Sequence, residues 1–433
     1  MFCQLDTLRR CIPASIRKAL DELPITLDET YEKTLECIPR EQRRHAHRLF
    51  QCLIAAIRPL RVDELTEIFA IQFDTKLGPN LMEGWRPEDP EEAVLTACSS
   101  LIAIVDVEDY RVAQFSHFSV KEFLTSDRLA ASNAGNISQY HIPLEPAHSI
   151  LAQACLTVLL QLDNETDKKR LGTFPLAFYA AQHWVDHAKF GSVASEVGDA
   201  MERLFDPKKS HLAAWTWIYD VNHWAERSMD DFTEHPRSPE ATPLYYAALC
   251  GFTGLAKYLI ITHAEDVNAK CGDMGNPLHG ACRDGQLECL QLLLEHGADI
   301  DARNDLQATP LHLASSGGLV EAVRLLLQHN ADMNAKCGFG LTPLHRALNS
   351  GEIKVAQLLL ESGADVNTLA KHQYTPLHSA LESGQLELVR LLLGHGADVH
   401  IRGIGSPTLF QQATEEGHHE IAQLLLEHGA QQE

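Results

Sequence analysis

Histidines and cysteines come first, because their spacing decides whether a chain can hold a metal ion. His183 and His187 stand four residues apart in the segment HWVDH, a spacing that places two imidazoles on one face of a helix. The segment lacks the glutamate that acts as general base in HExxH metalloproteases, and Asp186 is a poor substitute for it. We interpret the two histidines as an ordinary surface or packed pair.

The other candidates for metal or covalent chemistry are incomplete. His419 and Glu420 begin a similar pattern, but Gln423 occupies the position of the second ligand. The cysteines at 271, 282 and 289 lack the spacing of a zinc site, and the chain contains no GxSxG nucleophile elbow. The sequence therefore predicts no catalytic residue, no metal and no cofactor, and we expect a non-enzymatic protein.

Nucleotide hydrolysis by a P-loop needs the motif GxxxxGK[ST], whose backbone amides and lysine hold the phosphates. This sequence contains no Gly-Lys dipeptide. The segments GFG at Gly338 and GIG at Gly403 lack the rest of a dinucleotide-binding motif. We therefore expect no hydrolysis of ATP or GTP by this mechanism.

A ten-residue segment, TPLHRALNSG at Thr342, recurs with variations along the second half of the chain. The copies start at Thr242, Asn276, Thr309, Thr342, Thr375 and Thr408, with one spacing of 34 residues and four of 33. A fixed period in this range is typical of a stacked repeat array. In the copy at Thr342, Thr342 and Pro343 suit the start of a short helix, and Gly351 suits its end. A second helix with a leucine stripe follows, so we predict six helical copies over residues 241–433.

These copies resemble the ankyrin repeat, with TPLH at the head and GADID or GADVN at the tail. The resemblance implies an elongated concave face, made of the turn tips between copies and the exposed positions of each first helix, that binds a protein partner. We predict that ten residues of this face contact the partner. The tips supply Asp305, Leu306, Phe339, Lys371, His372 and Ile404, and the first helices supply Arg283, Leu313, Arg346 and Glu382. Alternatively, Phe339 folds back onto the neighbouring turn.

The first 240 residues lack this period. Residues 1–40 read as helical, and residues 41–128 follow the order of a winged-helix domain, three helices and then a β-hairpin. Residues 145–232 read as an aromatic-rich helical connector. The predicted fold class is thus mostly α: an ankyrin-repeat α-solenoid preceded by a winged-helix domain and a helical connector.

Winged helices often bind DNA, which requires cationic side chains on the third helix. Here that helix, PEEAVLTACSS, has no Lys or Arg, and residues 81–110 hold eight acidic residues against one basic residue, Arg86. The whole chain carries a formal charge of −23, which also opposes binding to a polyanion. We predict no nucleic-acid partner.

The chain shows no secretory signal and no apolar run of about 18 residues, the length that a membrane span requires. Its eleven cysteines form no CxxC pair, as expected for free thiols in a reducing compartment. We therefore expect a cytoplasmic protein with no membrane partner.

Five segments carry a wider resemblance: CQLDTLRRC, LPITLDETYEKTL, AIRPLRVDELTEIFA, SHFSVKEFL and PLAFYAAQHWVDHA. Together they resemble the downstream half of fungal NACHT–ankyrin proteins, signal-transducing NTPases of the STAND class. The winged-helix segment also resembles the type named after GPI inositol-deacylase, which does not imply deacylase activity. The resemblance implies the sensor and regulatory half of such a protein, without the P-loop module, so residues 1–40 would follow a NACHT-type module.

Four alternatives stay open from the sequence. The chain is a free-standing ankyrin scaffold or adaptor, or a truncated gene model of a NACHT NTPase whose P-loop lies upstream of Met1. A DNA-associated regulator is the third alternative, against which the acidic wing counts. In the fourth, the repeats dock on the N-terminal half of the same chain instead of on a separate protein.

Overall fold

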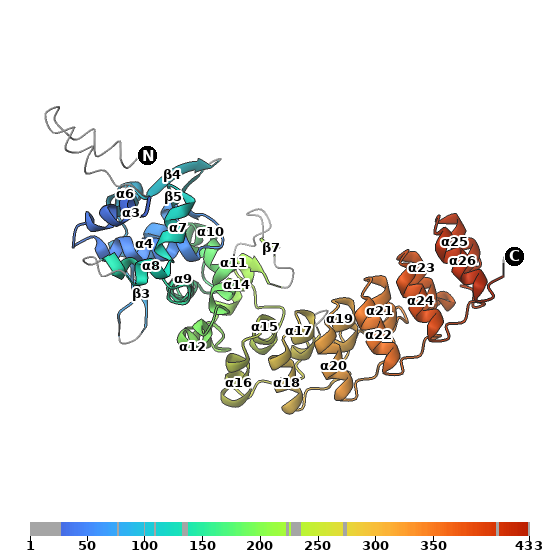
Figure 1. Cartoon of the computed structure of the whole chain (residues 1–433). Coiled ribbons are helices and arrows are strands. Elements are labelled where there is room, and N and C mark those ends of the chain that lie inside the picture. Colours follow the sequence, from blue (N-terminus) through green and yellow to red (C-terminus); the bar gives the residue numbers. More distant parts are fainter. Residues whose placement is uncertain are drawn as a thin grey trace. The chain divides into compact units, whose positions relative to one another are not determined.

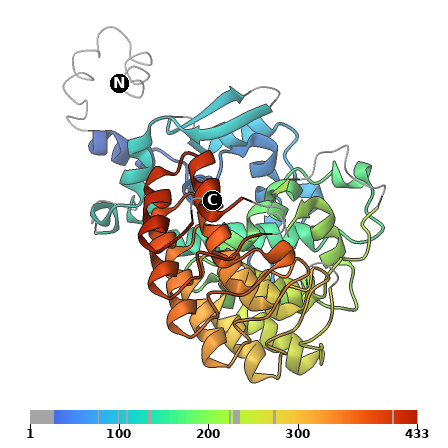
Figure 2. The same cartoon turned by 90° about the vertical axis from the view of Figure 1, so that its right-hand side faces the viewer.

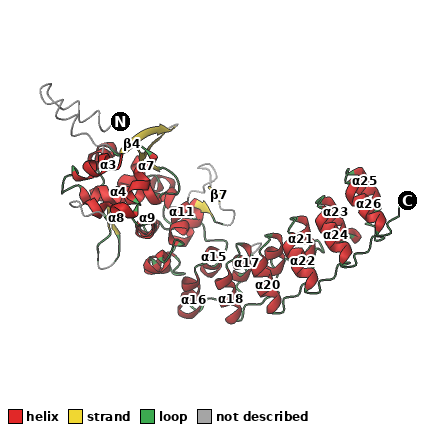
Figure 3. Cartoon of the chain, in the orientation of Figure 1, coloured by secondary structure: helices red, strands yellow, loops and turns green. Residues whose placement is uncertain are grey.

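The computed structural model describes residues 27–75, 78–98, 100–107, 110–131, 137–221, 225–226, 235–271, 275–403 and 407–431. The chain divides into two compact units, Met1–Pro239 and Glu240–Glu433. Both are built mainly from helices, and the few strands lie in the first unit (Figure 3). The predicted fold class is confirmed: ankyrin repeats follow a winged-helix domain with a small sheet. Of the predicted helical residues 1–40, residues 1–26 lie outside the described residues.

The winged-helix domain contains three helices and a three-stranded antiparallel sheet. The helices are α4 (Arg43–Ala55), α5 (Val62–Phe69) and α6 (Pro90–Cys98), preceded by α3 (Leu27–Glu36). The sheet has the order β1-β5-β4, from β1 (Leu60–Arg61), β4 (Ile102–Val107) and β5 (Tyr110–Phe115). A small pair, β2 (Ile71–Gln72) and β3 (Asn80–Leu81), lies between α5 and the 3-10 helix η2 (Glu83–Trp85).

Apolar spacing explains these elements. Leu49, Phe50 and Ile54 form the buried face of α4, and Leu65 and Ile68 form that of α5. The sequence predicted the three helices and the hairpin of β4 and β5 closely. It missed β1, because a strand of two residues leaves no alternating pattern.

The rest of the first unit is helical. Its elements are α7 (Phe118–Leu124), α8 (Asp127–Ala130), η3 (Ile137–Tyr140), α9 (Leu144–Leu159), α10 (Lys168–Leu171), α11 (Ala177–Ala188), α12 (Val193–Glu196), α13 (Gly198–Leu204), α14 (His211–Ile218), and the short pair β6 (Tyr219–Asp220) and β7 (Ala225–Glu226). The long helix α9 packs against both α4 and α11 (Figure 1). No described helix is long and apolar enough to cross a bilayer.

Aromatic side chains form part of the core of this helical region. Trp184 and Trp215 are fully buried, with ring centroids 5.2 Å apart, and Phe205 packs against both. The indole nitrogen of Trp215 donates to the carbonyl oxygen of Ala181 at 2.8 Å. Trp217 is also buried, whereas Trp224 lies outside the described residues.

A buried carboxylate ties the winged helix to this helical region. Glu67, on α5, accepts a hydrogen bond from the backbone N–H of Leu176 at 2.7 Å, and its other oxygen pairs with Arg86 at 2.5 Å. Glu67 is 1% exposed. The two regions therefore share polar as well as apolar contacts, in keeping with their forming one compact unit.

The described residues of the second unit form six helix pairs. They are α15 (Pro243–Cys250) with α16 (Thr253–Thr262), α17 (Pro277–Arg283) with α18 (Leu287–Glu295), α19 (Pro310–Ser316) with α20 (Val320–Gln328), α21 (Pro343–Asn349) with α22 (Ile353–Glu361), α23 (Pro376–Glu382) with α24 (Leu386–Gly394), and α25 (Leu409–Glu415) with α26 (His419–Glu427). Each pair packs beside the next in chain order (Figures 1 and 2). Leucines of the second helices, such as Leu359 and Leu392, are fully buried.

The TPLH segment explains how each pair starts and how neighbouring copies connect. In the fourth copy, the side chains of Thr342 and His345 form a capping box at the start of α21. The backbone N–H and hydroxyl of Thr342 lie 3.2 and 2.9 Å from His345 Nδ1. The other ring nitrogen, Nε2, lies 3.4 Å from the carbonyl oxygen of Tyr374, the residue directly before the next copy. Since Nδ1 accepts, Nε2 carries the proton and donates.

Candidate protein-binding surface

Three consecutive turn tips of the second unit, residues 304–308, 337–341 and 370–374, form a backbone ladder. Each tip closes on itself: Asn304 N–H donates to the Ala308 carbonyl at 3.1 Å, and Cys337 N–H to the Leu341 carbonyl at 2.9 Å. Neighbouring tips also bond to each other, through Gly338 N–H to the Leu306 carbonyl at 2.8 Å and Lys371 N–H to the Phe339 carbonyl at 3.2 Å. Leu306, Phe339 and Lys371 thus lie on consecutive tips, and we call these three residues the tip ridge.

The apolar side chains of the tip ridge face solvent. Phe339 is 59% exposed and Leu306 is 50% exposed. Lys371 places its amine 5.5 Å from the centroid of the Phe339 ring, within the range of a cation–π contact. Phe339 is thus covered only in part by its neighbouring tip, and an apolar surface with an adjacent cation remains exposed.

The other predicted tip residues have mixed placements. Asp305 and His372 are exposed. His372 adopts a left-handed backbone with φ of 60°, as does the adjacent Gln373. Ile404 lies outside the described residues.

The predicted residues of the first helices are less exposed than those of the tips. Arg283 on α17, Leu313 on α19 and Arg346 on α21 are half-buried, and Glu382 on α23 is exposed. Arg283 is already engaged, because its side chain hydrogen-bonds the Tyr245 hydroxyl and thereby opposes the rise that burial causes in the pKa of Tyr245. Glu382 is engaged in the same way, through a side-chain hydrogen bond with Tyr374.

Several buried polar atoms on the first helices lack hydrogen-bond partners in the described part of the chain, among them Ser315 Oγ, His378 Nε2 and two atoms at matching positions of neighbouring helices. These two atoms are Nε of Arg346 and Oγ of Ser379, which occupy equivalent positions of α21 and α23. Unpaired buried donors are rare, and a bound ligand is one way to satisfy them. The sequence marked Arg346 but not Ser379, since a serine on a helix carries no signal of burial.

Sequence reasoning also missed Tyr374, which ends the turn tip of residues 370–374. Burial raises the pKa of its hydroxyl, and the adjacent Glu382 carboxylate raises it further. The available signal was the residue type, because the equivalent positions of the preceding copies hold Ala308 and Leu341.

His183, His187 and the three cysteines considered for metal chemistry pack into the interior, whereas His419 is exposed. His187 is fully buried, with Nε2 2.9 Å from the Tyr179 hydroxyl and Nδ1 2.9 Å from His148 Nδ1, and burial lowers its pKa to about 3. His183 lies 3.5 Å from Asp186. Burial raises the thiol pKa of Cys271 and Cys282. Within the described ranges, no group of three His, Cys, Asp or Glu residues is arranged to hold a metal ion.

Models of two known protein families match this chain. The family of ankyrin repeats (3 copies) matches residues 221–304, 244–337, 311–403 and 369–433. The winged helix domain of GPI inositol-deacylase matches residues 31–136. The winged-helix match begins within α3, extends past α8 and includes the whole sheet of β1, β5 and β4.

A curated relative is similar over much of the chain. It is the azaphilone pigments biosynthesis cluster protein L of Monascus ruber, 30% identical over 290 residues. That alignment covers 63% of this chain and 60% of the relative, so the chain spans about three fifths of the relative's length. The fold and these similarities agree: the chain carries a winged-helix domain of the GPI inositol-deacylase type followed by ankyrin repeats.

Proposed function

We propose that this chain is a non-enzymatic protein-interaction module that binds a partner protein through the tip ridge and the adjoining first helices. The observation that carries the proposal is the exposure of Phe339 and Leu306 on consecutive, hydrogen-bonded tips. Ankyrin repeats generally serve protein–protein recognition, and neighbouring exposed apolar side chains on a rigid frame suit that use.

The energetics favour Phe339 as an anchor. Burying a large apolar side chain completely contributes about 1.5–3 kcal/mol, and Phe339 is 59% exposed before any partner binds. The backbone ladder holds the tips in place, so a partner need not order them. Lys371 beside the ring adds a charge that a partner carboxylate can pair with while an apolar group covers the ring. Arg346 Nε and Ser379 Oγ offer further hydrogen bonds.

The finer role we propose is that of the sensor and regulatory half of a STAND-type signalling protein. The order of a winged helix of the GPI inositol-deacylase type before ankyrin repeats supports this role. Partner binding on the repeats would then change the activity of a nucleotide-binding module joined to the chain. The competing role is a free-standing scaffold, for which partner binding is the whole function.

The binding proposal is tested with the full chain immobilised and exposed to lysate of its source cells. A double variant, Phe339→Ala with Lys371→Ala, is compared with a matched control, Ile261→Ala with Lys354→Ala. The control also removes an exposed apolar residue and an exposed cation, but from the second helices α16 and α22. We expect proteins that bind the wild type and the control but not the tip variant. Equal capture by all three chains would refute the proposed surface.

The two finer roles are separated by nucleotide turnover. In a protein where this chain follows a P-loop NTPase, the sensor role requires the Phe339→Ala and Lys371→Ala variant to lose any change of turnover caused by the captured partner. Turnover that does not respond to the partner in the wild type contradicts the sensor role and leaves the scaffold role.

A further inference from the structure

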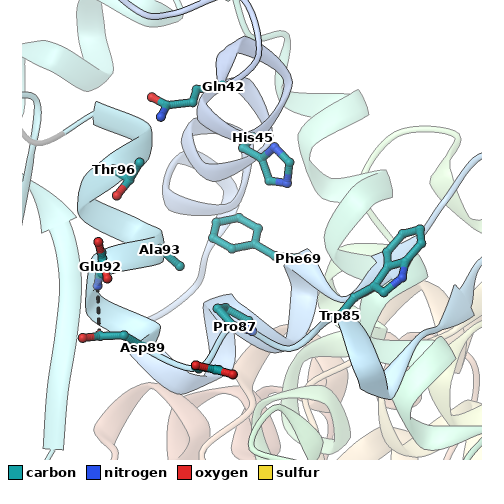
Figure 4. Close-up of a pocket in the computed structure, with 10 residues that line it drawn as sticks. Gln42, His45, Phe69, Trp85, Pro87, Asp89, Glu92, Ala93 and Thr96 are labelled. Atoms are coloured by element: carbon teal, nitrogen blue, oxygen red, sulfur yellow. Dashed lines mark hydrogen bonds between the residues drawn. The ribbon is translucent and has the colours of Figure 1, made fainter.

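The winged-helix domain contains a cleft that the proposed function does not use. Its volume is about 720 Å³, and it lies between the start of α4, the end of α5, the segment after η2, and α6. Figure 4 shows His45 of α4 facing Ala93 of α6 across the cleft, with the Phe69 ring between them. All lining residues belong to the first unit.

One wall of the cleft is aromatic. Trp85 is 55% exposed, although a side chain of this size is usually well covered. Phe69 and His45 lie edge to face, with ring centroids 5.9 Å apart. The wall therefore offers aromatic ring surface to whatever enters the cleft.

The other wall is acidic. Glu88, Asp89 and Glu92 line the cleft and are exposed. Asp89 Oδ1 accepts from the backbone N–H groups of Glu91 and Glu92 at 3.0 Å each, which caps α6 and leaves Oδ2 available. Within the described ranges, none of these three carboxylates has a salt bridge to a Lys, Arg or His side chain.

The cations near the cleft are engaged elsewhere. Arg86 pairs with the buried Glu67 at 2.5 Å, Arg44 pairs with Asp74, and Arg48 stacks over the Phe73 ring at 4.3 Å. Burial, followed by the charges of Arg48 and Arg44, lowers the pKa of His45, so this lining histidine is neutral at pH 7. The cleft thus presents three uncompensated negative charges on one side and the exposed ring of Trp85 on the other (Figure 4).

We propose that this cleft binds a basic protein segment with two arginine side chains, one guanidinium stacking on Trp85 and the other donating its N–H groups to the opposite, acidic wall that contains Glu88 and Glu92. A guanidinium stacks on aromatic faces and donates in pairs to carboxylates, whereas the lysine amine is a more strongly hydrated point charge. Helix α6 occupies the place of the helix that reads DNA in other winged helices, and its acidic turn selects a cationic protein segment instead. The site is independent of the tip ridge.

The test measures binding of a short fluorescent peptide containing two arginines flanked by glycines to the full chain, by anisotropy at low salt. We expect saturable binding that weakens about tenfold in Trp85→Ala and in the double variant Glu88→Gln with Glu92→Gln. The matched controls are Phe118→Ala and Glu122→Gln on α7, which remove an exposed aromatic ring and an exposed carboxylate outside the cleft. We expect these controls to bind like the wild type. All variants replace exposed side chains, so an unchanged thermal midpoint verifies folding.

Three outcomes would overturn the proposal. Equal weakening in the cleft variants and the controls would mean diffuse attraction to a chain of charge −23. If a two-lysine peptide bound as tightly as the two-arginine peptide, the cleft would not be specific for guanidinium groups. Binding of spermidine as tight as that of the arginine peptide, and lost in the same variants, would assign the cleft to a free polyamine rather than to a protein side chain.

Discussion

His312 Nε2 lies 3.0 Å from the carbonyl oxygen of Leu341, so one histidine joins the first helix of the third copy to the turn tip that leads into the fourth copy. Its other nitrogen, Nδ1, accepts from the backbone N–H and the hydroxyl of Thr309 at 3.1 and 2.8 Å. The side chain is fully buried. His279 makes the equivalent bond to Ala308 at 3.0 Å, so the contact recurs between copies. A single side chain thus caps a helix and fixes its neighbour.

Replacing His312 by alanine is expected to reduce the free energy of unfolding of the second unit by about 2–4 kcal/mol, because it leaves a cavity and unpaired polar groups. The sixth copy shows a milder replacement: Gln411 occupies the equivalent position, and its Oε1 accepts from Thr408 N–H at 3.0 Å. His312→Gln should therefore destabilise less than His312→Ala.

Urea unfolding of the full chain measures both variants. All five tryptophans precede residue 225, so their fluorescence reports the first unit, whereas far-UV circular dichroism reports both units. Only the dichroism transition should shift. His419→Ala removes an exposed histidine of α26 and serves as the control. A His312→Ala transition that coincides with the control would contradict the role of this contact.

The same histidines make the second unit sensitive to acid. Burial lowers the pKa of His312, His345 and His378 from 6.5 to about 4. The unfolded chain therefore binds protons at these sites before the folded chain does. The free energy of unfolding should be constant above pH 6.5 and fall as the pH drops from 6.5 toward 4.

Urea titrations across this pH range check the prediction, with the triple glutamine variant of His312, His345 and His378 as reference. Glutamine does not titrate, so the variant should lose less stability than the wild type between neutral and acidic pH. Parallel pH dependence of the two chains would show that other groups cause the acid sensitivity.

The sequence predicted those features that repeat or that depend on local spacing. The TPLH segments predicted that helices start at Thr309, Thr342 and Thr375. Each of these threonines forms a capping box in the structure. The sequence could not predict the cleft, because the lining residues, from Gln42 to Thr96, come together only after the helices pack. Nor could it predict that Glu67 would contact Leu176, since these residues lie 109 positions apart. The exposure of Leu306 and Phe339, by contrast, could be predicted, because each is an apolar residue within a turn.

Gly340 sets the distance between two tips. Its φ is +75°, and an added Cβ would lie 3.1 Å from Lys371 N and 3.3 Å from Ala370 Cα in the next tip. Gly340→Ala is therefore expected to lower the free energy of unfolding of the second unit by about 1–3 kcal/mol, through the left-handed backbone and the crowding. If the proposed surface is correct, the variant should also weaken partner capture, because the crowding displaces the backbone beside Phe339 and Lys371.

Gly254→Ala is the matched control. This glycine lies inside α16, and its added Cβ would have no neighbour within 4 Å. Alanine has the higher helix propensity, so this change should stabilise by about 0.5–1 kcal/mol. Equal dichroism midpoints for the two variants would show that the tips adjust to the extra methyl group.

Glu67 offers a test of the first unit, because it connects the winged helix to the helical region that follows. Burial raises the pKa of its carboxyl, while the bonds from Leu176 N–H and Arg86 oppose that rise. Glu67→Ala removes the acceptor and leaves both donors unpaired, so we expect a loss of about 3–5 kcal/mol in the free energy of unfolding. Glu67→Gln keeps an acceptor for Leu176 and removes the buried charge, so it should lower the free energy of unfolding by less.

Tryptophan fluorescence in urea measures both changes, with Glu122→Gln as the exposed control. If Glu67→Ala unfolds at the same urea concentration as this control, the buried carboxylate does not join the two regions energetically.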